Sequence, residues 1–256
     1  MADPDLGRVG VWGHLDTFSA ADARAYARRV DELGFGTLWV PETVGREPFA
    51  LLGMLAGEVR HASLGTSIVS IWGHDAQATR MGAATLAEAT SGRFVLGLGV
   101  SHPHLAAKLR GHDFDRPLTR MREYLAAYRS AVYRGPGPDD APILVAALRE
   151  RMLDLSATEA DGAFPYLVTA DRVAWMRRRL DEAVPGRRPL LAVTLPVWIG
   201  ADRGAARAYL KPYLRTPTYH ASKPWSSPDA GADHVAVIPI APDGTTEYLS
   251  TLEAVA

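Results

Sequence analysis

The sequence predicts an α/β fold, a single (β/α)8 TIM barrel spanning residues 1–256, with a shortened region before its eighth strand. Its 256 residues are a usual length for this fold. Apolar segments typical of buried strands alternate with amphipathic helical segments, an order that indicates a parallel sheet with helical crossovers. Eight such units favour a closed barrel over an open sheet. The strands are expected to begin near Arg8, Gly36, Leu64, Arg93, Pro142, Phe164, Leu190 and Asp233.

The segment between the first two strands predicts an amphipathic helix. Ser19 is a suitable N-cap, and Asp22, three positions later, is its expected capping-box partner. Gly34 is expected to end the helix, because glycine readily adopts the left-handed backbone that follows a helix. The inward face is expected to consist of Tyr26, Val30 and Leu33.

Two later helices show the same periodicity. The fourth is expected to bury Leu118, Met121, Leu125, Tyr128 and Val132, and the sixth Val173, Met176 and Leu180. The run Arg177–Arg179 is interpreted as a solvated face of the sixth helix. A nucleic-acid patch is the alternative, but three charges without aromatic partners support it weakly.

Two segments interrupt the alternation. Residues 135–140 are a turn-rich connection that precedes the fifth strand. Residues 215–231 carry no apolar periodicity, so a full βα unit and the usual lead-in helix are not expected there. Only residues 247–255 are left for a closing helix.

Composition narrows the function classes. The net charge of −1 predicts neither a nucleic-acid partner nor a membrane-surface partner. The absence of cysteine excludes disulfides, zinc–thiolate sites and thiol nucleophiles. No leader peptide and no membrane-spanning run is recognised, so a soluble cytoplasmic protein is expected.

The stretch from Gly92 to His102, GRFVLGLGVSH, is the strongest functional signal. A buried strand runs into Gly97 and Gly99 and then into Ser101 and His102. The carboxyl ends of barrel strands carry the active site. Small residues there let a flat ligand approach the backbone, and a histidine exchanges protons near neutral pH.

The other strand ends are rich in tryptophan, glycine and histidine, and Glu42 is their one obvious acid. A hydrolase with paired carboxylates is therefore disfavoured, and a flat aromatic cofactor on apolar and indole surfaces is favoured. The residues that define this rim include Trp12, His14, Trp72, His74, Ala147, Thr169 and Trp198.

Structural alternatives exist for each of these residues. His102 either moves protons or binds a ligand, or it caps the following segment, and Glu42 could simply pair with a basic neighbour. His102 and His104 lack a third ligand at helical spacing, so no metal is expected. Gly97 and Gly99 lack the third glycine of a dinucleotide fingerprint. Trp39 lies inside its strand and is expected in the core.

At these residues the chain resembles the bacterial luciferase-like family of flavin- and deazaflavin-dependent oxidoreductases. The resemblance covers most of residues 8–215, and within the family it is greatest to an actinobacterial subgroup that uses deazaflavin coenzyme F420. The matching blocks, whose order and spacing are specific, are Ala27–Glu42, Gly65–Trp72, Ala83–His102, Phe114–Glu123 and Ser156–Gly162.

The resemblance implies a tricyclic ring in the barrel mouth, with a non-proline cis peptide behind it at Ser70–Ile71. Thr169 and Ala170 would approach the phosphate at a helix N-terminus. The cofactor site implied as a whole consists of Ser70, Ile71, Trp72, Gly99, Val100, Ser101, Ala147, Thr169 and Ala170.

The function expected on this basis is hydride transfer between F420 and a small organic substrate, with His102 as first and His14 as second candidate acid or base. An FMN-dependent monooxygenase and a non-catalytic flavin- or deazaflavin-binding protein are the alternatives. Sugar-phosphate oxidation is disfavoured, because Val100 and Thr43 stand where the resembling dehydrogenases carry an acid and a histidine. A homodimer is usual in families of this kind.

Overall fold

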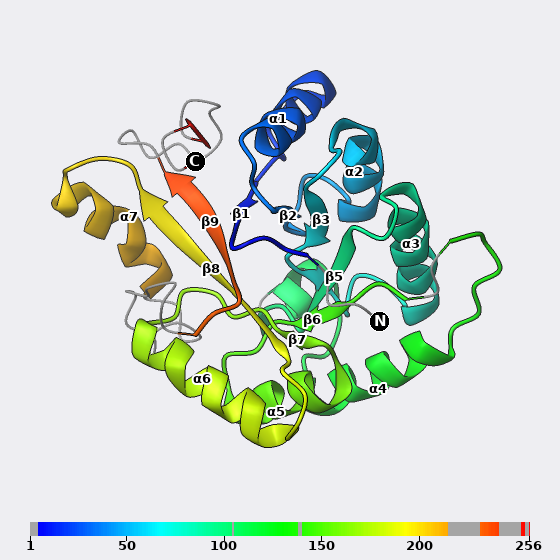
Figure 1. Cartoon of the computed structure of the whole chain (residues 1–256). Helices are drawn as coiled ribbons and strands as arrows, with labels where there is room; N and C mark the ends of the chain where they lie inside the picture. Colours follow the sequence, from blue (N-terminus) through cyan, green and yellow to red (C-terminus); the bar gives the residue numbers. More distant parts are fainter. Residues whose placement is uncertain (1–4, 104, 138–139, 215–230, 241–251, 254–255) are drawn as a thin grey trace.

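Eight parallel strands close into a barrel in the computed structural model, which describes residues 5–103, 105–137, 140–214, 231–240, 252–253 and 256 (Figure 1). Each strand pairs with the next around the ring, and the last pairs with the first. The expected fold class is therefore confirmed. The ring consists of β1 (Val9–Trp12), β2 (Thr37–Val40), β3 (Ser63–Thr66), β5 (Phe94–Gly99), β6 (Ile143–Val145), β7 (Gly162–Ala163), β8 (Leu190–Trp198) and β9 (His234–Ile240).

The predicted strand starts lie within two residues of the observed ones, and the largest difference is at β7. Trp39 of β2 is fully buried inside the barrel and packs on Phe164, with ring centroids 4.6 Å apart. The core position expected for Trp39 is confirmed.

The third barrel strand is interrupted. β4 (Val69–Ser70) continues it along β5, after a break at residues 67–68. Leu64 pairs with Phe94, 30 positions later, whereas Val69 pairs with Leu98, 29 positions later. The third strand therefore holds one extra residue at the break, which is the geometry of a bulge.

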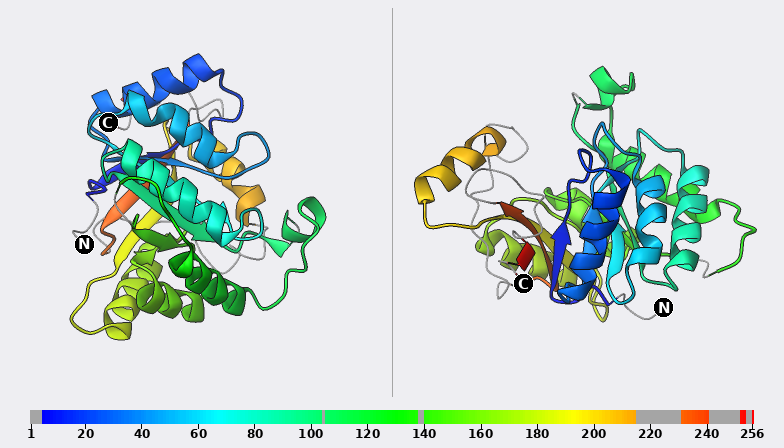
Figure 2. Two further views of the ribbon diagram at one scale, coloured as in Figure 1. Left: turned by 90° about the vertical axis from the view of Figure 1, so that its right-hand side faces the viewer. Right: turned by 90° about the horizontal axis from the view of Figure 1, so that it is seen from above.

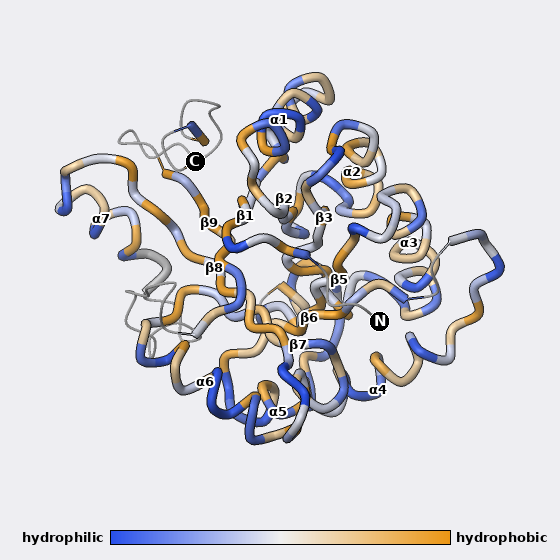
Figure 3. Tube along the Cα trace, in the orientation of Figure 1, coloured by the Kyte–Doolittle hydropathy of each residue, from blue (hydrophilic) through white to orange (hydrophobic). Residues whose placement is uncertain are grey.

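Helices cover the outside of the barrel, as the two views of Figure 2 show. Figure 3 shows apolar residues along the strands and mixed polarity along the helices, as expected for a barrel whose helices face both core and solvent. The helices are α1 (Ala20–Glu32), α2 (Pro48–Leu55), α3 (Ala76–Ala89), α4 (Pro117–Ser130), α5 (Glu150–Glu159), α6 (Ala170–Ala183) and α7 (Arg203–Leu214), with a 3-10 turn η1 (Ala56–Glu58) and a π-helical turn η2 (Leu105–Leu109).

The caps predicted for α1 are confirmed. The Asp22 backbone N–H donates to Ser19 Oγ over 3.1 Å, and the Ser19 hydroxyl donates to the Asp22 carboxylate over 2.6 Å. Gly34 follows the helix with φ of +79°. The inward faces of α4 and α6 are largely confirmed, but Val132 is 60% exposed because α4 ends at Ser130 and the backbone is extended at the next residue.

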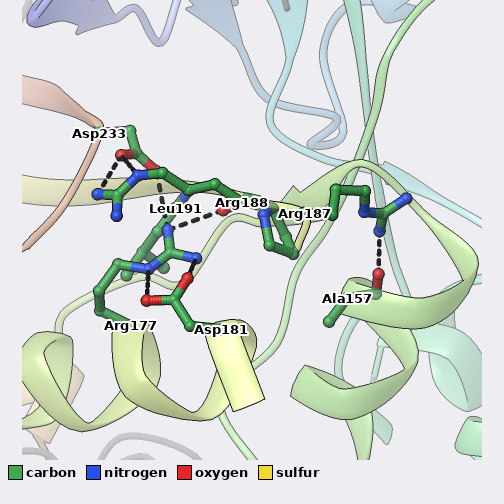
Figure 4. Close-up of polar contacts among 8 residues, drawn as sticks. Ala157, Arg177, Asp181, Arg187, Arg188, Leu191 and Asp233 are labelled. Atoms are coloured by element: carbon green, nitrogen blue, oxygen red, sulfur yellow. Dashed lines mark hydrogen bonds and ion pairs between the residues drawn. The ribbon is translucent and has the colours of Figure 1, made fainter. Parts of the chain in front are cut away.

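The interpretation of the arginine run is wrong for its first member. Arg177 is buried, and Figure 4 shows its guanidinium directed toward Asp181 of the same helix and toward Asp233. Arg177 lies next to the buried Met176, on the side of α6 that faces the barrel. Arg178, one position later, points to solvent as expected.

The segment that interrupts the sequence pattern follows α7. Residues 215–230 lie outside the described residues, as do 241–251 and 254–255, so the expectations for a shortened region and for the closing helix stay predictions. None of the helices described is both long and apolar enough to cross a membrane.

Candidate functional site

A cavity of about 700 Å³ opens at the carboxyl ends of the strands. Its wall combines residues from all eight barrel strands or the loops that follow them, so it is the mouth of the barrel. The lining residues that matter for its chemistry are Trp12, His14, Glu42, Thr43, Ser67, Ile68, Val100, Ser101, His102, Ala147, Tyr166 and Thr194.

The cis peptide lies three residues earlier than the resemblance implied. It joins Ser67 and Ile68, at the break between β3 and β4, and not Ser70 and Ile71. The prediction placed it at the end of the third strand, but that strand first ends at Thr66 and resumes only as β4. Ser67 and Ile68 consequently line the cavity, while Ser70 and Ile71 are buried outside its lining.

The two glycines of β5 make room for the third strand, and not directly for a ligand as predicted. A Cβ at Gly97 would lie 2.0 Å from the Thr66 carbonyl oxygen, and one at Gly99 would lie 2.5 Å from Ile68 Cδ1. Their missing side chains therefore let the Ile68 side chain pack on β5. Ile68, in turn, forms part of the cavity wall.

Of the predicted site residues, His14, Val100, Ser101, His102 and Ala147 meet at this cavity. Ser101 adopts a left-handed backbone with φ of +55°, which turns the chain at the end of β5. Trp72 lies outside the lining and donates its indole N–H to the Val100 carbonyl over 2.8 Å. Gly99, Thr169 and Ala170 also lie outside the lining, and Thr169 caps α6.

Two buried hydroxyls of the cavity wall have no hydrogen-bond partner among the described residues. They are Ser67 Oγ and Thr194 Oγ1. Ser67 as a residue is 9% exposed, and Thr194 is 1% exposed. Buried polar groups are almost always hydrogen-bonded. A ligand with polar atoms at its edge would satisfy these hydroxyls, and this feature fits a heteroaromatic cofactor or an oxygen-bearing substrate.

Glu42 is paired with basic groups, as the structural alternative anticipated. Its carboxylate, 6% exposed, accepts the Ser70 N–H over 2.7 Å, forms an ion pair with Arg110 and lies 3.4 Å from His74 Nε2. The Glu42 carboxylate raises the pKa of His74 above its ordinary value, against an opposing effect of burial. Glu42 therefore enters the wall as part of a charge cluster.

His14 has a carboxylate partner that the sequence analysis missed. Its imidazole stacks on Trp12, with ring centroids 6.3 Å apart and planes 7° apart, and its Nε2 lies 3.5 Å from Asp16 Oδ2. The spacing in the sequence could have indicated this pair, because Asp16 follows His14 by two residues in the loop after β1. His102 lines the same cavity, and its carbonyl accepts the N–H groups of Leu105 and Ala106, over 3.0 Å each, at the start of η2.

Across the described ranges, no three His, Cys, Asp or Glu side chains converge in a way that could hold a metal ion. The arrangement as a whole is an apolar cavity with a few polar groups at fixed places, which is typical of sites for small molecules and cofactors.

Comparison with known proteins decides the family. The family model described as luciferase-like monooxygenase matches residues 5–238. The chain belongs to the luciferase-like monooxygenase family. This luciferase-like chain is 28% identical over 245 residues to a Mycobacterium tuberculosis protein that carries the name of a coenzyme F420-dependent oxidoreductase; the match covers 81% of this chain and 70% of that protein.

A second relative is the 5,10-methylenetetrahydromethanopterin reductase of Methanolobus tindarius, 26% identical over 155 residues. That match covers 54% of the luciferase-like chain and 47% of the reductase, so it spans about half of each. Among solved structures, an F420-dependent secondary alcohol dehydrogenase in complex with an F420–acetone adduct superposes with a TM-score of 0.76 at 13% identity. The superposition covers 97% of this chain and 99% of the dehydrogenase, so the two proteins share a fold.

Proposed function

We propose that this luciferase-like protein is an oxidoreductase that transfers a hydride between coenzyme F420 and a small organic substrate. The observation that carries the proposal is the apolar cavity of about 700 Å³ at the barrel mouth, with two hydroxyls in its wall that no described residue partners. A flat ring with a polar edge needs this combination of surfaces. The names of the Mycobacterium tuberculosis relative and of the structural neighbour support F420 as the ring.

In this proposal the residues of the cavity hold and orient the coenzyme. Ile68, Val100 and Ala147 would form apolar contacts with the ring, and the hydroxyls of Ser67 and Thr194 would satisfy polar atoms of coenzyme or substrate. Deazaflavin supplies a ring carbon that gives or takes a hydride. The predicted roles of Ser70, Ile71, Trp72 and Gly99 become indirect here, since they support the wall from behind.

The phosphate of the coenzyme is proposed to lie near the N-terminus of α6, at Thr169 and Ala170, where a helix dipole favours an anion. His102 and His14 are the proposed sources and acceptors of protons. We propose further that the chain is a single domain, that it forms homodimers and that it binds no nucleic acid.

Titration of the purified protein with F420 tests the proposed function directly. Binding to the purified protein should quench coenzyme fluorescence, and coenzyme at 100 times its dissociation constant should raise the free energy of unfolding by about 2.7 kcal/mol. No binding at about 100 μM coenzyme would contradict the proposal. Turnover is then measured as reoxidation of reduced F420 across a panel of carbonyl and alkene acceptors.

FMN is the second candidate, because the matching family model is named for monooxygenases. An FMN-dependent monooxygenase would be yellow as purified and would release flavin on heating, and FMN would displace F420 in the titration. Coenzyme binding without turnover across the panel would favour a non-catalytic binding protein.

A further inference from the structure

We propose that Asp16 is a positioning residue that orients the His14 imidazole, so that His14 exchanges the proton that accompanies hydride transfer. This inference rests on the proposed function for its chemistry. Its geometric part, the orientation of His14 by Asp16, stands independently of any coenzyme. Asp16 lies outside the lining of the cavity, whereas His14 lies in it.

The loop after β2 is built around the Asp16 carboxylate. The Thr43 hydroxyl donates to Asp16 Oδ2, and the Arg46 backbone N–H donates to Asp16 Oδ1 over 3.1 Å. Between them lies Gly45, where a Cβ would be 2.4 Å from Asp16 Cγ. Only glycine leaves space for the carboxylate at this point, so the loop and the acid fit each other.

A second set of bonds fixes the loop after β1, which carries both His14 and Asp16. The Arg46 guanidinium donates from Nε to the Leu15 carbonyl over 3.3 Å, and from Nη2 to the Phe18 carbonyl. The two loops are thereby tied together. Asp16, whose side chain is 15% exposed, is therefore fixed with one oxygen toward His14.

The imidazole of His14 is restrained from two sides. Its ring stacks on Trp12, and its Nε2 faces Asp16 Oδ2 at 3.5 Å. Catalytic hydrogen bonds are often this long before the substrate binds, and they shorten in the reacting complex. A carboxylate at Nε2 favours the tautomer that carries its proton on Nε2, and it also stabilises the imidazolium.

The chemistry balances with one proton for each hydride. A substrate carbonyl that accepts a hydride at its carbon, with two electrons from the reduced coenzyme, needs one proton at its oxygen. His14 would enter this step as imidazolium and leave it as neutral imidazole, and the Asp16 carboxylate would remain ionised throughout. In the opposite direction His14 would accept the proton.

The geometric part is tested on the protein without coenzyme, by 15N NMR of its histidine side chains. In the wild type, the Nε2–H tautomer of His14 is expected, with the signal assigned by His14→Gln. Asp16→Asn offers an amide N–H to Nε2 and should shift His14 toward the Nδ1–H tautomer.

Two further variants change the surroundings of Asp16. Thr43→Val and Gly45→Ala should weaken the preference of His14 for the Nε2–H tautomer. The matched changes Thr158→Val and Gly53→Ala, on exposed or open helix positions, should leave this preference unchanged.

The chemical part is tested with menadione, a quinone whose reduction to the hydroquinone consumes one hydride from the reduced coenzyme and one proton. Asp16→Asn should lower kcat about 100-fold, while the dissociation constant of the coenzyme stays within about twofold. Asp16→Glu should restore part of the rate, which a merely structural role would not explain.

An unchanged tautomer in Asp16→Asn would overturn the positioning role, and an unchanged kcat would overturn the role of His14 in proton exchange. Failure of the wild type to bind F420 would instead reject the proposed function, and the tautomer would still report on Asp16. Failure of the coenzyme-loaded wild type to reduce menadione would reject the chemical part for carbonyl acceptors.

Discussion

At the scale of single residues, His234 shows how the barrel floor differs from its mouth. His234 is 1% exposed, accepts the Trp39 indole N–H at Nε2 over 3.0 Å and bonds the Gly7 carbonyl through Nδ1 over 2.8 Å. Since Nε2 accepts, Nδ1 must carry the proton, so the ring is neutral. Burial lowers the pKa of His234 to about 4, although hydrogen bonds to backbone carbonyls oppose the effect.

Acidification should therefore destabilise the protein through His234. The unfolded state binds a proton near pH 6.5 and the folded state only near pH 4. The free energy of unfolding should consequently fall between these values, by about 3 kcal/mol in total, and be unaffected above pH 7. His234→Gln should lose this contribution. Urea unfolding followed by tryptophan fluorescence from pH 7.5 to 4.5 measures this loss of stability. An equal dependence of the free energy of unfolding on pH in the wild type and in His234→Gln would contradict the role of His234.

At the scale of elements, Glu42 joins three segments at the cavity wall. It follows β2, receives the N–H of Ser70 from β4, and pairs with Arg110 just beyond η2. Gly73 leaves space for the ion pair of Glu42 and Arg110, because a Cβ there would lie 2.3 Å from the Arg110 guanidinium.

The segment after η2 also packs His112 and Phe114 on the Trp72 ring. The wall formed by η2 thus depends on one buried carboxylate.

Glu42→Gln is expected to lower the pKa of His74 toward its ordinary value and to loosen η2. In the wild type the raised pKa of His74 stabilises the fold below its ordinary pKa, and this contribution is lost as pH rises. The destabilisation by Glu42→Gln should therefore be larger at pH 5.5 than at pH 8.5, and about 1–2 kcal/mol overall, because solvent screens the partly exposed Arg110.

Proton NMR titration of His74 and hydrogen exchange of residues 105–111 measure these effects. Glu123→Gln on α4 removes the same charge from an exposed position and serves as the control. Unchanged exchange in Glu42→Gln would show that η2 is held by the aromatic contacts of Trp72 alone.

At the scale of the whole molecule, Arg177 ties the start of β9, the last strand of the ring, to the rest of the barrel. From α6 it bonds the Pro189 carbonyl before β8 over 2.7 Å and pairs with Asp233 before β9 at 3.0 Å. Asp233 also accepts the Leu191 N–H over 2.9 Å (Figure 4). β9 closes the ring between β8 and β1, so this network supports the closure.

Arg177→Met should destabilise the protein by about 3 kcal/mol, because it removes the buried cation that pairs with Asp233 and leaves that carboxylate only the exposed Arg188 as an ion-pair partner. Arg178→Met changes the neighbouring exposed arginine in the same way and should alter the free energy of unfolding by less than about 0.5 kcal/mol. Equilibrium unfolding in urea compares the two variants. Equal effects would mean that Arg177 contributes only as a surface charge.

Much of the fold was predictable because its signals are local. Ser19, Asp22 and Gly34 mark the ends of α1, and apolar runs mark all eight strands. The cavity residues His14, Val100, Ser101, His102 and Ala147 follow from one rule, that barrel strands deliver their chemistry at their carboxyl ends. The position of the cis peptide was missed, because a one-residue bulge in the third strand leaves no periodic signal in four residues.

The amino-acid sequence by itself determined the number of barrel units, the ends of α1 and the rim from which the site is built, because each depends on residues within a turn or a strand of one another. Only the tertiary structure decided that Gly99 makes room for Ile68, that Arg177 is buried against Asp233 and that Thr43 and Gly45 surround Asp16. These contacts join residues 27 to 56 positions apart, and closure of the barrel brings them together.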